Sequence, residues 1–304
     1  MAISRAQLVK ELEPGLNALF GLEYKRYENQ HAEIYTTESS DRAFEEEVML
    51  SGFANAQTKV EGSGVSFDEA QETYTARYTH DTIALAFAIT EEAIEDNLYD
   101  RLASRYTKAL ARSMSNAKQV KAVTPLIQGL PSTDNYDSGD AVSLFSTNHS
   151  TVSGTAVKNT LTTQADLNET SLEQALIDIA AFTDERGLRV AAKGTKMIVP
   201  SANQFAAERL LKSQGRTGTA DNDINAVVSM GMVPQGYRVN NFLTDSDSWY
   251  IITDVPNGMK MFQRAALKTA MEGDFDTGNV RYKARERYSF GVSDYRGIFG
   301  VEGA

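Results

Sequence analysis

The clearest hydrophobic pattern in the chain lies near its C-terminus, between residues 281 and 292. Every second residue at the start of this stretch is cationic: Arg281, Lys283, Arg285 and Arg287. The positions between and after them are mainly apolar, with Glu286 as the exception: Tyr282, Ala284, Tyr288, Phe290 and Val292. A period of two predicts a long, half-buried β-strand. We expect its cationic face to meet acidic side chains, either across the same hairpin or on another copy of the chain.

A second long hairpin is predicted upstream. Residues Thr58 to Phe67 and Thr73 to Ile89 have strand-like sequences, and the acidic segment from Asp68 to Glu72 joins them. The second strand has about 17 residues and would reach roughly 55 Å. Because such a hairpin has no core of its own, we predict that it lies on a neighbouring subunit.

Two helices flank this hairpin. Ser4 to Phe20 predicts a helix with a break near Pro14, and the polar stretch from Gly21 to about Glu45 predicts an extended arm. The longer helix is predicted from an N-cap at Thr90 to Val123, where Thr124-Pro125 stops it. Its apolar residues recur at every fourth position: Ile94, Leu98, Leu102, Tyr106, Leu110 and Met114. This stripe winds around a rod of roughly 50 Å, so different partners are expected along its length.

The middle of the chain combines a long polar segment with an alternation of helices and strands. In residues 129–163, only Val142 to Phe145 is apolar enough to act as an anchor. Capping boxes at Ser171–Gln174 and Ser201–Gln204 predict two helices. Their predicted ends are Gly187 and about Lys212. The predicted strands are Lys196–Pro200, Tyr237–Asn240, Trp249–Thr253, and the hairpin of Met259–Met271 with Asn279–Val292.

The composition is that of a globular protein, with 304 residues, 41% hydrophobic and 23% charged. The net charge of -11 argues against general nucleic-acid binding and against docking on anionic membranes. The absence of cysteine excludes disulfides, thiol nucleophiles and zinc–thiolate sites. No apolar run reaches the roughly 18 residues of a membrane-spanning helix.

No catalytic motif is found in the sequence. Asp274 and Asp276 resemble the opening of a calcium loop, but Gly278 and Arg285 stand where further ligands belong. We therefore expect a solvated or intersubunit turn there. The three histidines lie far apart, and a surface position or local hydrogen bonding is expected for each: His31, His80 and His149. The prediction is a protein with no enzymatic activity, no cofactor and no metal.

Four segments carry a resemblance to a known family. They are residues 8–21 (LVKELEPGLNALFG), 78–80 (YTH), 87–96 (FAITEEAIED) and 287–300 (RYSFGVSDYRGIFG). Together with the order of arm, projecting hairpin, long helix, α/β region and second hairpin, they resemble the major capsid (head) protein of tailed bacteriophages. More narrowly, the segments are similar to those of Mu-like prophage major head subunits.

The resemblance implies an α+β fold of the Hong Kong 97 type. Its parts would be the N-terminal helix and arm (1–50), the E-loop hairpin (51–89), the spine helix of the P domain (90–123), the A domain (124–257), the long P-domain hairpin (258–292) and a C-terminal return segment (293–304). The E-loop would lie on the adjacent subunit, A-domain loops would gather at hexamer and pentamer centres, and the P-domain hairpin tip would lie near three-fold contacts.

The resemblance also implies partners. Hexamers and pentamers of the chain would close into an icosahedral shell around packaged double-stranded DNA, without sequence-specific contacts and without a membrane. The virion would be assembled in the host cytoplasm. Because no scaffolding domain precedes the arm, a separate scaffolding protein is expected, with a portal and a decoration protein as further candidates. The Lys–Asn cross-link of some family members is not carried over, because nothing identifies an asparagine partner for Lys59.

The residues predicted at contacts between subunits lie on the E-loop and on the P-domain hairpin. They are Lys59, Gly62, Gly64, Asp68, Glu69, Glu72, Arg77, Glu272, Asp274, Asp276, Arg281, Arg285 and Arg287. Two alternatives stay open. An encapsulin-type shell of the same fold would hold cargo enzyme, and a cleft against the N-terminal helix would favour it. A soluble α/β enzyme would need a pocket that gathers Asp137, Asp140 and His149.

Overall fold

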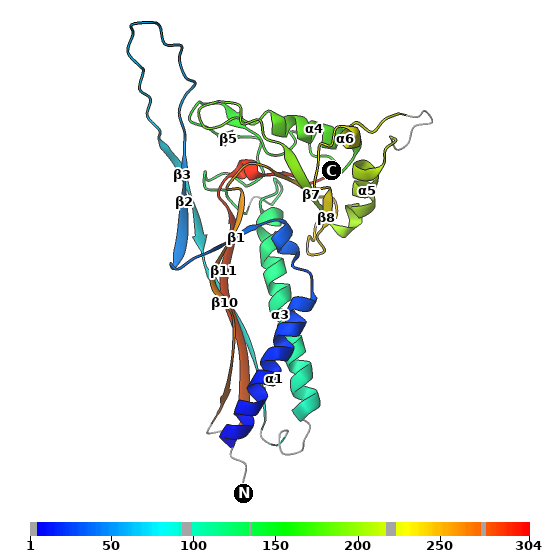
Figure 1. Ribbon diagram of the computed structural model, residues 1–304. Helices are drawn as coiled ribbons and strands as arrows, with labels where there is room; N and C mark the ends of the chain where they lie inside the picture. The colour runs from blue at the N-terminus through cyan, green and yellow to red at the C-terminus, as the bar shows by residue number, and fades with distance from the viewer. Residues whose placement is uncertain (1–4, 91, 93–98, 134, 217–222, 275–277) are drawn as a thin grey trace.

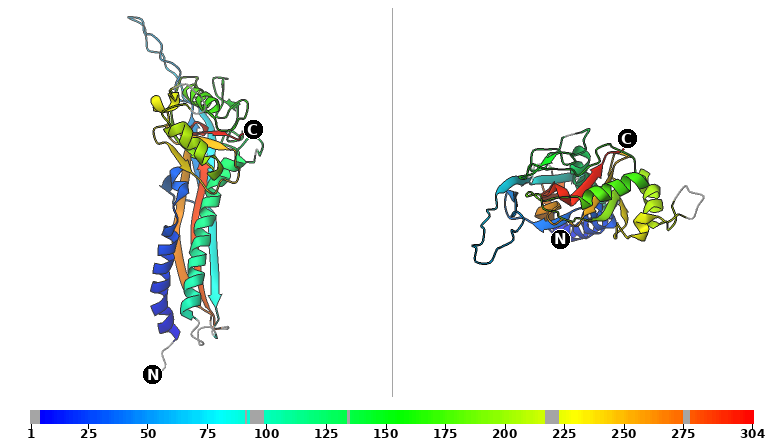
Figure 2. Two further views of the ribbon diagram at one scale, coloured as in Figure 1. Left: turned by 90° about the vertical axis from the view of Figure 1, so that its right-hand side faces the viewer. Right: turned by 90° about the horizontal axis from the view of Figure 1, so that it is seen from above.

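The computed structural model describes residues 5–90, 92, 99–133, 135–216, 223–274 and 278–304. The molecule is elongated: a rod-like shaft carries a wider head at one end, and a thin loop projects beyond the head (Figure 1). The turned view shows the two shaft helices in front of the shaft strands (Figure 2). The shaft therefore has two layers, and within the described residues one face of its sheet carries no helix.

The shaft sheet has the strand order β1-β10-β11-β4. Its strands are β1 (Thr36–Ser39), β10 (Met259–Gly273), β11 (Val280–Val292) and β4 (Asp81–Ile89). The predicted hairpin of β10 and β11 is confirmed, and β4 pairs antiparallel with the other edge of β11. The helices α1 (Arg5–Arg26) and α3 (Tyr99–Gln128) contact each other and the sheet.

The alternation predicted for β11 is confirmed. Arg281, Lys283 and Arg285 are exposed, whereas Tyr282 and Ala284 are buried. The buried side chains pack with apolar residues of both helices: Leu16, Phe20, Leu110, Ala111 and Met114. The period of two thus places one face of the strand under the helices and leaves the cationic face open.

Glu286, the exception in the alternation, is fully buried on the helix side of β11. Its carboxylate lies 3.2 Å from the Lys118 ammonium of α3 and accepts a hydrogen bond from the Tyr24 hydroxyl of α1 at 3.3 Å. The ammonium also lies 5.0 Å from the centre of the Tyr288 ring. A buried carboxylate needs such partners. Glu286, the acidic residue that breaks the alternation, therefore joins the two helices to the strand.

Both shaft helices pass through a proline at which the sequence predicted a break or an end. α1 continues through Pro14 to Arg26, and α3 continues through Pro125 to Gln128. An interior proline costs about 3 kcal/mol because it removes a backbone hydrogen bond. The buried residues that flank the prolines offset this cost: Leu16, Phe20, Ala122, Val123 and Leu126. Most of the first turns predicted for the long helix, residues 91 and 93–98, lie outside the described residues.

The first hairpin differs from the prediction. Strand β2 (Phe44–Leu50) pairs with β3 (Glu72–Thr79), and the described residues 51–71 between them contain no strand. The predicted strand at Thr58–Phe67 is therefore wrong. A strand forms where alternating side chains find a partner, and Gly52, with φ of 67°, ends β2 before that segment. His80 divides the predicted second strand into β3 and β4, which belong to different sheets.

The predicted arm from Gly21 to Glu45 is likewise not extended throughout. The helix α1 takes its first residues to Arg26, a short 3-10 turn follows at Gln30–Glu33, and β1 then joins the shaft sheet beside β10. Buried Ile34 and Tyr35 hold this segment in the core. A run of two apolar residues is too short for the sequence pattern to predict that they are buried.

The head is built around the sheet β12-β9-β7-β8. Its elements are β7 (Gly194–Val199), β8 (Tyr237–Val239), β9 (Trp249–Thr253), β12 (Ile298–Val301), α4 (Glu169–Ala180), α5 (Gln204–Lys212) and α6 (Ala226–Ser229). The predicted strands are confirmed, and the sheet forms the centre of the largest apolar core. A short pair, β5 (His149–Ser150) with β6 (Ala156–Val157), lies within the polar segment, which Leu144 and Phe145 anchor as predicted.

The helix caps in the head correct the predicted ones. Asn168, not Ser171, caps α4, and Ser171 completes the capping box from the third helical position. This helix ends at Ala180, before Gly187. A 3-10 turn at Ser201–Asn203 leads into α5 without a side-chain cap. In both cases an equally good capping residue, or a turn, lay within three residues of the predicted one.

Replacing Glu286 by Ala is expected to lower the free energy of unfolding by about 3–5 kcal/mol, because Lys118 keeps a buried charge without a partner. The double variant Lys118→Met/Glu286→Leu is expected to lose less than the single variant. Urea unfolding measures both. Lys121→Met is the control, since its partner Asp81 is exposed, and its loss is expected to stay below about 1 kcal/mol. Equal losses for Glu286→Ala and the control would contradict the structural role of the pair.

Candidate assembly surfaces

The strands β2 and β3, called the ribbon here, are fixed to the shaft at their base by buried polar groups. Lys260 of β10 is 6% exposed and forms an ion pair with Glu47 of β2. The Ser293 hydroxyl donates to the same carboxylate and is bonded to the hydroxyl of Tyr78 on β3. A second carboxylate, Glu38 of β1, lies 3.3 Å from the Lys260 ammonium. These bonds set where the ribbon leaves the shaft.

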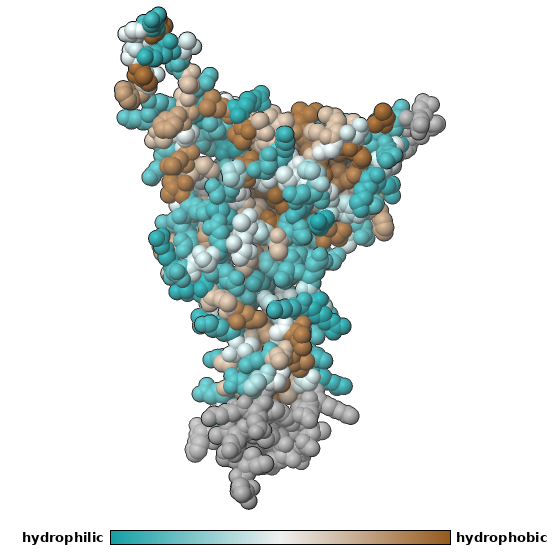
Figure 3. Space-filling view, viewed as in Figure 1, coloured by the Kyte–Doolittle hydropathy of each residue, from teal (hydrophilic) through white to brown (hydrophobic). Residues whose placement is uncertain are grey.

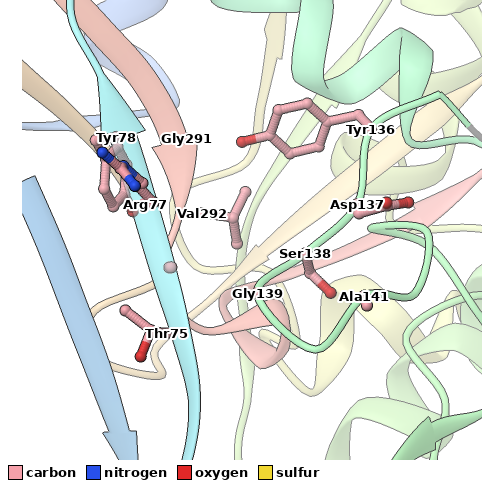
Figure 4. Close-up of a pocket in the computed structure, with 11 residues that line it drawn as sticks. Thr75, Arg77, Tyr78, Tyr136, Asp137, Ser138, Gly139, Ala141, Gly291 and Val292 are labelled. Atoms are coloured by element: carbon pink, nitrogen blue, oxygen red, sulfur yellow. The ribbon is translucent and has the colours of Figure 1, made fainter. Parts of the chain in front are cut away.

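Two glycines allow the ribbon to pack closely on the body. A Cβ atom on Gly291 would lie 2.5 Å from the Tyr78 ring, and one on Gly139 would lie 2.6 Å from the Tyr74 ring. A pocket of about 310 Å³ remains between β3 and residues 136–141. In Figure 4, Tyr136 and Tyr78 stand on opposite sides of this space. Side chains larger than hydrogen at either glycine would displace the ribbon.

Residues 51–71, called the projecting loop here, extend from the ribbon beyond the head (Figure 1). Four of its hydrophobic residues are exposed: Phe53, Val60, Val65 and Phe67. The space-filling view shows hydrophobic (brown) surface on the loop (Figure 3). Phe67 is 98% exposed. The loop contacts the head through Arg186, whose guanidinium lies 3.7 Å from Asp68 and donates to the Glu69 carbonyl. Exposed apolar side chains on a loop without a core mark a surface for another protein.

The open face of the shaft sheet carries a row of cations, called the cationic strip here: Arg281, Lys283, Arg285, Arg287 and Lys268. Lys268 of β10 lies opposite Arg285. On the other side β4 places alanines beside the row: Ala84, Ala86 and Ala88. Arg281 pairs with Asp274 in the same chain. Among the described residues, the other members of the strip form no ion pair.

The upper end of the strip is more buried. Burial lowers the pKa of His80, and the nearby cations Arg287 and Arg264 lower it further. The imidazole is bonded to the hydroxyls of Ser40 and Ser289, at 2.9 and 3.0 Å. His80 is thus hydrogen-bonded at the point where the chain passes from the ribbon into the shaft, but it is buried, and its partners lie far away along the chain, so a surface position is wrong for it.

The predicted contact residues fall into two groups. The first is on the projecting loop and ribbon: Lys59, Gly62, Gly64, Asp68, Glu69, Glu72 and Arg77. The second is on the shaft hairpin: Glu272, Asp274, Arg281, Arg285 and Arg287. Asp276 lies outside the described residues. Several members pair within the subunit, since Asp68 binds Arg186, Arg77 lies 3.7 Å from Glu46, and Arg281 binds Asp274. The sequence did not indicate Arg186, Glu47 or Lys260, because their partners lie far away along the chain.

The polar segment of the head contains a buried imidazole. His149 Nδ1 lies 2.7 Å from the Asp140 carboxylate, and Nε2 lies 3.1 Å from the Asn159 oxygen. The Asn159 nitrogen donates to the carbonyls of Leu144 and Tyr295, which fixes the amide oxygen toward His149. The His149 ring has no exposed surface and stacks on Tyr295 at 3.9 Å. These bonds tie the polar segment to the C-terminal residues.

The arrangement gives no support to the enzyme alternative. His149 and Asp140 meet as that alternative required, but Asp137 lines surface pockets that do not include His149. Because the imidazole is enclosed by protein, a substrate cannot reach it. In the described part of the chain, no cluster of three His, Asp or Glu side chains is placed to hold a metal ion. No described helix is long and apolar enough to span a membrane.

A groove of about 550 Å³ lies between the end of α1 and the middle of α3. Its walls include Arg105, Lys108 and Arg112 of α3, with Tyr27 on the opposite side. A cleft against the N-terminal helix was the feature that would favour a cargo-holding shell.

The fold is that of a tailed-phage capsid subunit of the Hong Kong 97 type. The solved structures that the chain resembles include a virus-like particle from Pyrococcus furiosus, the capsid of an empty GTA particle, and the capsid of the Myoviridae phage XM1. Their sequence identities are 10%, 14% and 11%, with TM-scores of 0.51, 0.55 and 0.54. The alignments cover 94%, 92% and 89% of this chain, and 98%, 91% and 89% of theirs.

The family follows from the sequence itself. The profile of a family described as phage capsid protein matches residues 73–301. No curated protein matches the sequence. The chain belongs to the phage capsid protein family, and it is a subunit of a capsid shell.

Gly291→Ala is expected to loosen the ribbon, because the added methyl group overlaps the Tyr78 ring. The cost of such overpacking is about 1–3 kcal/mol. Hydrogen exchange of β2 and β3 should become faster, while exchange in the head sheet stays unchanged. Gly64→Ala is the matched control, since a Cβ there meets nothing within 4 Å. Unchanged exchange in β2 and β3 of Gly291→Ala would show that close packing does not seat the ribbon.

Asp140→Asn is expected to remove a pH-dependent part of the stability. Burial would raise the pKa of Asp140, but hydrogen bonds from His149 and Ser138 outweigh it and the pKa is lowered. The carboxylate therefore stabilises the fold above its unfolded pKa, about 3.9, and this contribution disappears as the pH falls through the lower folded pKa. Unfolding of both proteins from pH 7 to pH 3 measures the difference. A difference that does not shrink toward pH 3 would contradict the assignment.

Proposed function

We propose that this capsid subunit assembles as hexamers and pentamers into the icosahedral head of a tailed phage, around packaged double-stranded DNA. The phage capsid family match carries this proposal. In this proposal the shaft is the P domain with α3 as its spine helix, the head is the A domain, and the ribbon with the projecting loop is the E-loop. The E-loop then begins at β2, earlier than residue 51. Membership of the Mu-like branch stays a prediction.

We build the contacts between subunits from two surfaces that have few partners among the described residues of the subunit. The projecting loop offers exposed apolar side chains and the carboxylate of Glu69, and the carboxylate of Glu72 follows at the start of β3. The open sheet face offers the cationic strip beside a row of alanines. We place the projecting loop of one subunit on the open sheet face of a neighbour, with its carboxylates on Lys283 and Arg285. Opposite charge steers such an association, and the apolar side chains cover the alanines.

The remaining roles follow from a shell around DNA. The subunit has no catalytic function, and its net charge of -11 suits a wall that confines DNA without reading its sequence. A separate scaffolding protein, a portal and a decoration protein are the further partners, and assembly takes place in the host cytoplasm. The groove against α1 is the one observation that favours a cargo-holding shell of the encapsulin type. Nuclease-protected DNA in purified particles supports the phage head, and enclosed protein without DNA supports the alternative.

Reversing charge at the proposed contact tests it. Lys283→Glu/Arg285→Glu is expected to fold but to form few closed shells, because like charges then face each other. Adding Glu69→Lys/Glu72→Lys in the same chain should restore shells. Electron microscopy and sedimentation measure both. Lys193→Glu/Arg209→Glu on the head, with the same change in net charge, is the control. Shells from the first variant would refute the contact, and wild-type protein that never forms shells would refute the proposed function.

A further inference from the structure

The groove between α1 and α3 has a cationic wall. Arg105, Lys108 and Arg112 are spaced by three and four residues, so they form one stripe along α3 about 10 Å long. In the described part of the chain, none of the three forms an ion pair. The acid in the groove, Glu23, is already bound by Arg26 and by the Tyr27 hydroxyl, both at 3.5 Å. The groove is thus locally cationic in a chain with a net charge of -11.

The floor of the groove is apolar, in contrast to its cationic wall. Ala109 lies between the cations, and on the opposite side the Tyr27 ring, 39% exposed, stands 5.9 Å from the Arg112 guanidinium; Ser113 and Asn116 complete the lining toward the end of the groove. An apolar floor beside a cationic wall suits an amphipathic peptide. A phosphate backbone needs the cations alone and gains nothing from the floor. The observations therefore favour an acidic protein segment over nucleic acid.

The groove is formed without a ligand. Leu16 and Phe20 of α1 pack in one buried cluster with Leu110 and Met114 of α3. Near the end of the groove, the Tyr24 hydroxyl is bonded to the carboxylate that binds Lys118. The two helices are held apart at a fixed distance by these contacts. A ligand consequently finds the site in place and does not have to open it.

We propose that this groove binds an acidic, partly apolar helical segment of a different protein, laid along α3. Carboxylates spaced by three or four residues on that helix would meet Arg105, Lys108 and Arg112, and an apolar side chain between them would rest on Ala109. The site lies on the helix layer, whereas the proposed contact between subunits lies on the open sheet face. Peptide binding in the groove can therefore be tested separately from the proposed contact between subunits.

The probe is a labelled synthetic helix of about three turns, roughly 11 residues, with Glu at positions spaced by three and four and Leu between them. Fluorescence anisotropy with the full chain measures its affinity. Arg105→Glu/Lys108→Glu/Arg112→Glu is expected to weaken binding about tenfold or more, since each exposed ion pair adds a small amount. Arg42→Glu/Lys193→Glu/Arg209→Glu, at exposed cations elsewhere with the same change in net charge, is expected to bind as the wild type does.

A second variant separates docking in the groove from general attraction of charge. Ala109→Trp fills the floor and keeps all three cations, and it is expected to weaken peptide binding about as strongly, with an unchanged circular dichroism spectrum. A Gln-for-Glu version of the peptide should bind weakly to every variant. Equal losses in both triple variants would overturn the proposal, as would undiminished binding to Ala109→Trp. Tighter binding of a duplex DNA oligomer at the same site would also overturn it, in favour of nucleic acid.

Discussion

The buried ion pair between Lys118 and Glu286 determines how the shaft is put together. It links three elements at one point, because the Tyr24 hydroxyl of α1 bonds to the same carboxylate. Alternation alone does not fix the position of β11 under the helices, since a shift by two residues keeps the same faces buried. Such a shift would leave a cavity, or a buried charge without a partner, at the place where the ion pair now lies. A buried ion pair adds little net stability, and its contribution here is to select one register.

The selected register decides what the subunit shows to its surroundings. With Glu286 under the helices, the odd-numbered cations of β11 point to the open face, and the alanines of β4 lie beside them. A two-layer shaft must leave one sheet face uncovered. Because that face carries charged side chains in place of apolar ones, the free subunit does not expose a large hydrophobic patch that would promote aggregation. Large exposed apolar side chains are found instead on the ribbon and the projecting loop, among them Val48, Leu50 and Phe67.

The sequence was sufficient where one strong periodic signal dominated, and insufficient where distant residues compete. The alternation at residues 281–288 predicted β11, its buried face and its cationic face. The same reasoning failed for residues 58–67, because strand pairing is a property of two segments and the better partner for β3 lay at Phe44–Leu50. Proline signals failed at Pro14 and Pro125 because burial along the helices outweighed a local cost. Long-range pairs such as Glu47 with Lys260 leave no local pattern at all.

The ribbon combines a fixed base with an unpacked tip, and this division suits a contact between subunits. Its base is held by Lys260, by Ser293 and by the close approach of Gly291 to Tyr78. The orientation of the loop is therefore set before any partner binds, so binding does not include the entropy cost of orienting the loop. The tip has few backbone hydrogen bonds of its own, among them one from Ser51 to Gln71 at its neck. In the proposed contact, the neighbour's surface would supply the packing for Phe67, and the strength of the contact would depend on both subunits being folded.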